Sequence, residues 1–147
     1  MIYLDNAATS FPKPECVYDA VDLYNRQNGR AVGRGTSDAG QHLQQIVNRC
    51  RFRAAQVLGA SANEEIVFTL NCTDSLNMII HGLLKPGDHV VTSVAEHNSV
   101  LRPLRHLEAN RDVTLTLVNV DDAGFSDAAD VEKAIRPETK LLMLQHA

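Results

Sequence analysis

The sequence lacks the patterns that mark several common classes of protein. No apolar run approaches the roughly 20 residues that a membrane-spanning helix needs, and no basic segment followed by an apolar stretch indicates a signal peptide. Basic residues are not in excess, because 14 Lys and Arg face 18 Asp and Glu for a formal net charge of −4. A clustered basic face is what nucleic-acid binding requires. We therefore expect a cytoplasmic protein with no membrane or nucleic-acid partner.

Metal and nucleotide motifs are also missing. The three cysteines form no CxxC pair and the six histidines form no HxxxH or HExxH, so neither a metal site nor a redox pair is predicted. Gly33-Arg34-Gly35 begins a GxGxxG pattern whose third glycine position holds Asp38, and the P-loop spacing of residues 35–40 is followed by Gln41-His42 instead of Lys-Ser/Thr. The remaining features, 147 residues that are 44% hydrophobic and 22% charged, are typical of one globular domain with a real core.

Apolar spacing predicts helices and strands in alternation. We expect helices around residues 17–24, 43–58, 76–83, 101–107 and 127–135, and strands at 66–70, 89–93, 113–120 and 141–144. Ser37 or Asp38 is expected to cap the second helix and Gly59 to end it, after a flexible glycine-rich loop at 28–40. The alternation indicates an α/β fold with a mostly parallel sheet. Because a buried-type strand runs almost to Ala147, we expect the chain to be a fragment.

The loop at residues 69–75 precedes a predicted helix and is rich in hydroxyl groups. Ligands of open α/β sheets bind beyond the carboxyl ends of strands, and the free N–H groups of a helix N-terminus attract anions such as phosphate. The alternative is that Thr73 or Asp74 merely caps the helix.

A second polar loop, residues 95–99, follows the predicted strand at 89–93. His97 in this loop is a candidate for stacking on an aromatic cofactor or for moving a proton. The alternative is a partly exposed loop histidine, with Asn98 or Ser99 capping the next helix.

These segments, in this order, resemble one family. They are Tyr3-Leu4-Asp5-Asn6-Ala7-Ala8-Thr9, the loop at 28–40, residues 68–77 and Glu96-His97-Asn98-Ser99. Residues 83–88 and 134–137 extend the resemblance. Together they resemble the class V aminotransferases, and within them the cysteine desulfurases and selenocysteine lyases. The resemblance implies a fold-type I large domain that binds pyridoxal 5′-phosphate (PLP), a three-layer α/β/α arrangement. Residues 1–147 would then be its N-terminal arm and first part, truncated before the rest of the large domain and the C-terminal small domain.

The resemblance also implies roles for individual residues. Cys72 and Thr73 match the pair that binds the cofactor phosphate, and His97 matches the histidine that stacks on the pyridine ring and is placed for catalytic proton transfer. Asn6, Ala7 and Ala8 match the wall on the substrate side. Asp74 and Ser75 are expected to hold the phosphate loop in shape, whereas Asn77 supports that loop or is simply a polar residue on a core-facing helix. The family pattern differs at residues 29–35, which lack its Asn-Pro pair, and at Asn71, where glycine is common.

The activity implied by the resemblance is conversion of L-cysteine to L-alanine with transfer of sulfur to an enzyme cysteine. The whole protein would be a homodimer, with a sulfur-acceptor protein as a further partner. The family's Schiff-base lysine, the aspartate on the pyridine nitrogen and the acceptor cysteine match nothing in this chain, so the chain alone is expected to be inactive. The alternatives are another class V reaction, transamination or selenocysteine cleavage, and a non-catalytic remnant that acts only by binding.

Overall fold

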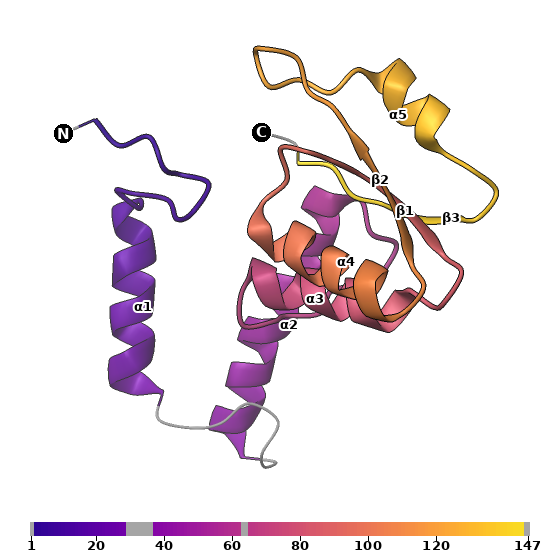
Figure 1. Ribbon diagram of the computed structural model, residues 1–147. Coiled ribbons are helices and arrows are strands. Elements are labelled where there is room, and N and C mark those ends of the chain that lie inside the picture. The colour runs from indigo at the N-terminus through magenta and orange to yellow at the C-terminus, as the bar shows by residue number, and fades with distance from the viewer. Residues whose placement is uncertain (1, 29–36, 63–64, 146–147) are drawn as a thin grey trace. The chain divides into compact units, whose positions relative to one another are not determined.

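The computed structural model describes residues 2–28, 37–62 and 65–145. The chain divides into two compact units, residues 1–67 and 68–147 (Figure 1). The first unit holds the helices α1 (Glu15–Gln27) and α2 (Asp38–Leu58). The second unit holds α3 (Cys72–Leu83), β1 (His89–Ser93), α4 (Asn98–Asn110), β2 (Thr114–Val118), α5 (Ala128–Ala134) and β3 (Thr139–Leu142). Across the described ranges, none of the helices is both long and apolar enough to cross a membrane.

The ends of α2 confirm the expectation from the sequence. The Ser37 hydroxyl accepts the Gly40 N–H at 3.4 Å, and Gly59 ends the helix with a left-handed φ of 69°, a conformation that glycine adopts without a Cβ penalty. Because Ser37 caps the helix, residues 38–40 form its first turn, and the prediction that they belong to a loop is wrong. The remainder of that predicted loop, residues 29–36, lies outside the described residues.

The second unit is built on a parallel sheet in the order β2-β1-β3 (Figure 1). Val90 on β1 pairs with Leu115 on β2 and Leu141 on β3, so β1 is the central strand and all five of its residues are buried. Parallel neighbours need crossover connections, which α4 and α5 provide. The predicted α/β fold with a parallel sheet is confirmed.

The two faces of the sheet have separate apolar cores, because successive strand residues point to opposite faces. Val90 packs with residues of α3 and α4, among them Ile80 and Leu104. Its neighbour Val91 packs on the other face with Val131 of α5. The second unit is thus a three-layer α/β/α arrangement, with α3 and α4 on one side of the sheet and α5 on the other (Figure 1).

Two predicted strands need correction. Residues 66–70 form no strand, and Val67 and Leu70 are 68% and 89% exposed. A strand needs a neighbour to share its hydrogen bonds, and within the described residues the three strands pair only with one another. The strand predicted at 141–144 begins earlier, as β3, and Leu144 lies beyond its end. Among the described residues β3 pairs with β1 alone, and its exposure alternates along the strand, so the burial that its leucines predicted is only partial.

Candidate functional site

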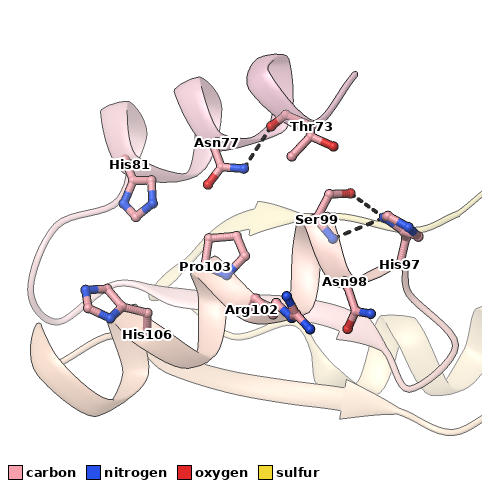
Figure 2. A pocket seen from close by; sticks show the side chains of 9 residues that line it. All are labelled: Thr73, Asn77, His81, His97, Asn98, Ser99, Arg102, Pro103 and His106. Carbon is pink, nitrogen blue, oxygen red and sulfur yellow. Dashed lines mark hydrogen bonds between the residues drawn. The ribbon is translucent and has the colours of Figure 1, made fainter. Parts of the chain in front are cut away.

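A groove of about 460 Å³ runs between α3 and α4 (Figure 2). The N-termini of both helices lie at one end of it, with Thr73 on α3 facing His97 and Ser99 at the start of α4. His81 and His106 lie at the other end. The complete lining is Thr73, Asn77, His81, His97, Asn98, Ser99, Arg102, Pro103 and His106. The groove therefore joins the two polar loops that the sequence singled out.

Asn71 caps the N-terminus of α3. Its side-chain oxygen accepts the backbone N–H of Asp74 at 2.9 Å, so the prediction that Thr73 or Asp74 is the cap is wrong. Asn71 adopts the extended backbone that a cap requires, with φ −165°. In the described part of the chain, the N–H groups of Cys72 and Thr73 have no hydrogen-bond acceptor. These two exposed residues thus leave donors available to an anion at the positive end of the helix.

Hydrogen bonds within residues 69–77 hold this helix end in shape. The Thr69 and Ser75 hydroxyls lie 2.5 Å apart, and the Asp74 carboxylate accepts the backbone N–H of Leu70 at 3.3 Å. The amide of half-buried Asn77 donates to the carbonyl of Thr73 at 2.8 Å and lines the groove (Figure 2). Asn77 thus bonds to the first turn of its own helix, and its support of a phosphate loop stays a prediction.

His97 caps α4, so the prediction that Asn98 or Ser99 is the cap is also wrong. Its Nδ1 accepts the backbone N–H of Ser99 at 3.1 Å and lies 2.8 Å from the Ser99 hydroxyl (Figure 2). A backbone N–H can only donate, so Nδ1 carries no hydrogen and the neutral ring carries its proton on Nε2. The cap thereby fixes both the tautomer and the orientation of the imidazole.

The described lining of the groove carries one permanent positive charge, on Arg102. None of the described residues that line the groove is a carboxylate. Arg102 and three histidines are part of the lining. Together with the two helix N-termini, this favours an anionic ligand. No group of three His, Cys, Asp or Glu among the described residues is arranged to hold a metal ion.

Sequence reasoning missed the far part of the groove, although its spacing was visible. Thr73, Asn77 and His81 are four residues apart on α3, and Asn98, Arg102 and His106 are four apart on α4. Residues at this spacing share one face of a helix. Two polar stripes of this kind, on two helices that pack against the same face of the sheet, could have indicated the far part of the groove.

Asn6, Ala7 and Ala8 belong to the first unit, where they form a turn. The side chain of Asn6 accepts the backbone N–H of Phe11 at 3.3 Å, and Ala8 donates its N–H to the carbonyl of Asp5 at 3.2 Å. Their predicted place on the substrate side remains a prediction.

The fold and the groove define a class of protein: an α/β domain with two helix N-termini at one end of a groove, an arrangement suited to an anionic ligand. The family model for aminotransferase class-V matches residues 2–147. The chain belongs to the aminotransferase class-V family.

The similar proteins include several cysteine desulfurases. The chain is 38% identical over 150 residues to a probable cysteine desulfurase of Pyrococcus abyssi and 35% identical over 152 residues to the cysteine desulfurase IscS of Dictyoglomus turgidum, each alignment covering 99% of this chain. It superposes on the solved structure of a cysteine desulfurase from Thermococcus onnurineus with a TM-score of 0.87, at 38% identity and 99% coverage of this chain. The chain spans only 36 to 37% of the length of these relatives.

Proposed function

We propose that this chain is the N-terminal part of a PLP-dependent cysteine desulfurase. Support comes from its family membership and from its similarity to proteins named as cysteine desulfurases. The observation that carries the proposal is the meeting of two helix N-termini with His97 at one end of a groove free of carboxylates.

In this proposal, the start of α3 holds the cofactor phosphate. The N–H groups of Cys72 and Thr73 and the Thr73 hydroxyl donate to its oxygens, since these N–H groups have no acceptor elsewhere in the described part of the chain. Asn71 and Asn77 keep the first turn of α3 in shape. A dianionic phosphate matches the two helix N-termini at this end of the groove, and Arg102 adds a positive charge to the lining.

His97 is assigned to the cofactor ring. When bound, PLP supplies an electron sink for carbanion chemistry at the amino-acid substrate. The imidazole of His97 offers a flat face for stacking on a pyridine ring. Because Nδ1 accepts the N–H of Ser99, Nε2 is the ring nitrogen that can hold or move a proton. Asn6, Ala7 and Ala8 are assigned to the substrate-side wall, as the resemblance implies.

The proposed reaction of the whole protein converts L-cysteine to L-alanine and transfers the sulfur to an enzyme cysteine. Cys16, Cys50 and Cys72 are free, exposed thiols, and the resemblance matches none of them to the sulfur-accepting position. That cysteine, the Schiff-base lysine and the aspartate on the pyridine nitrogen are assigned to the remainder of the protein. A homodimer and an acceptor protein for the sulfur complete the proposal, and residues 1–147 alone are expected to be inactive.

The test uses the protein expressed from its complete coding sequence. Purified protein is incubated with PLP, with a dithiol reductant that releases transferred sulfur from the enzyme as sulfide, and with either L-cysteine or L-selenocysteine. Alanine, sulfide and selenide are then measured. Alanine and sulfide in equal amounts from L-cysteine support the proposal. Turnover of L-selenocysteine alone, or transamination without sulfide, would instead indicate another reaction of the family. A protein that binds PLP but turns over no amino acid would indicate a remnant that only binds.

The phosphate assignment has its own control. Thr73→Val removes the hydroxyl and keeps the shape of the side chain, and Thr73→Ser restores the hydroxyl. We expect Thr73→Val to weaken PLP binding about 10-fold or more, as loss of a hydrogen bond to a charged group does, and to leave binding of pyridoxal, which lacks the phosphate, unchanged. Equal weakening for PLP and pyridoxal would contradict the assignment.

A further inference from the structure

The loop that presents His97 is held by both neighbouring strands. Residues 94–97 connect β1 to α4. The backbone N–H of Val94 donates to the carbonyl of Val118 at the end of β2, at 3.0 Å. On the other side, the backbone N–H of Gln145, just after β3, donates to the carboxylate of Glu96. The residue immediately before His97 is thus tied to a segment 49 positions further along the chain.

Two features strengthen the contact of Glu96, which is an exposed hydrogen bond. Its acceptor is a carboxylate, which forms stronger hydrogen bonds than a neutral group. The carboxylate also lies directly before the N-terminus of α4, where negative charge is favourable.

We propose that Glu96 is a positioning residue for His97. By accepting the N–H of Gln145, its carboxylate fixes the loop between β1 and α4 on the side of β3, while Val94 fixes it on the side of β2. Ser99 sets the tautomer and direction of the imidazole. Glu96 sets the position of the loop that carries it. The consequence for PLP binding rests on the proposed function. The tether, by which we mean the hydrogen bond between Glu96 and Gln145, does not.

The variants are Glu96→Ala, which removes the acceptor, and Glu96→Gln, which keeps a side-chain oxygen at the same reach. Glu108→Ala is the matched control, because Glu108 is a carboxylate on α4 that pairs only with Arg105, at 2.6 Å, among the described residues. The full-length protein is used throughout. The exchange rate of the Gln145 amide hydrogen measures the hydrogen bond to Glu96. The NMR chemical shift of the His97 ring Cε1–H measures the position of the imidazole. Titration with PLP measures the affinity of the proposed site.

We expect the Gln145 amide to exchange about 10-fold faster or more in Glu96→Ala than in the unchanged protein, as for loss of one hydrogen bond to a charged acceptor. The His97 ring signal shifts in Glu96→Ala. Both signals change less in Glu96→Gln than in Glu96→Ala, because its neutral oxygen still accepts the N–H but more weakly. Both signals stay near their original values in Glu108→Ala. Unchanged exchange at Gln145, or an unshifted His97 signal, would overturn the inference.

A double variant separates positioning from general stability. If Glu96 acts on PLP binding through His97, Glu96→Ala weakens binding in the original protein but adds nothing in a His97→Ala background. Effects that simply add would overturn the inference. If the unchanged protein bound no PLP at all, the proposed function would fail, and the exchange and NMR measurements would still decide whether Glu96 positions His97.

Discussion

The Nδ1 atom of His97 accepts a hydrogen bond from the backbone N–H of Ser99 at 3.1 Å, so the residue proposed to contact the cofactor ring is also the cap of α4. Histidine is not among the residues that most often cap helices. The same bond that stabilises the helix leaves a defined nitrogen, Nε2, for chemistry. One side chain thus links the stability of α4 to the proposed site, and substitutions can separate the two roles.

His97→Asn is expected to keep the cap and lose the function. The Asn side-chain oxygen can accept the N–H of Ser99, so the free energy of unfolding should stay close to the original value, whereas His97→Ala should lower it by about 1 kcal/mol. Both variants lack the imidazole, and both should lose most of the desulfurase activity and alter the absorption spectrum of bound PLP. Chemical denaturation and spectra of the two proteins give the comparison. Normal activity in His97→Asn would exclude a chemical role for the imidazole.

Asn71 offers a second helix cap to test, at the start of α3. Asn71→Ala leaves the N–H of Asp74 without its side-chain acceptor, and we expect it to reduce the free energy of unfolding by about 1 kcal/mol. PLP binding should weaken as well, since Cys72 and Thr73 lie in the turn that Asn71 holds. Asn71→Asp, which caps helices equally well, should retain stability. Urea denaturation and PLP titration measure the two effects, and an Asn71→Ala protein with unchanged stability would contradict the cap.

The sequence was informative where the signal is local. The apolar spacing of Leu43 to Leu58 with a glycine after it predicted α2, and a continuous β-branched run predicted the central strand β1. Their periodicity depends only on nearby residues. The two polar loops that the sequence singled out line one groove, and their role in binding a ligand stays a prediction.

The sequence was misleading where the outcome depends on a distant partner. Residues 66–70 have strand propensity, but a ladder needs a second strand, and none of the described strands pairs with them. The caps of α3 and α4 were misassigned by one to three positions. Asn71, Thr73 and Asp74 are all of residue types that cap helices, and only backbone geometry decides among them. The tether from Glu96 to Gln145 joins residues 49 positions apart and has no local signature.

His89 gives a prediction for the pH dependence of stability. It is fully buried on β1, and its two ring nitrogens lie 2.7 Å from the Thr139 hydroxyl and 2.9 Å from the Thr116 hydroxyl. Arg136 donates to both hydroxyls, through its backbone N–H at 2.8 Å and its guanidinium at 3.0 Å. Burial, and next the charge of Arg136, lower the pKa of His89 from its ordinary value of 6.5, and Glu138 opposes this in part.

A lowered pKa in the folded state means that the unfolded chain binds the proton more readily. The contribution of His89 to stability should therefore be complete above about pH 6.5, decrease as the pH falls below that value, and level off below the folded-state pKa. A single group changes the free energy of unfolding by at most about 1.4 kcal/mol per pH unit. Urea denaturation from pH 8 to pH 5 measures the slope. His89→Gln removes the titrating ring, so its slope below pH 6.5 should be shallower, and identical slopes would show that His89 contributes nothing.

Leu104 tests the packing that holds the groove. It is fully buried on the inner face of α4, in the core that joins α3, α4 and the sheet. Leu104→Ala should lower the free energy of unfolding by about 2–5 kcal/mol, the sum of lost burial and the cavity left behind. Arg105→Ala, one residue further along the same helix, removes an exposed ion pair with Glu108 and should cost less than about 1 kcal/mol. If denaturation gave the two variants equal stability, Leu104 would not be part of a close-packed core, and the placement of α4 on the sheet would be wrong.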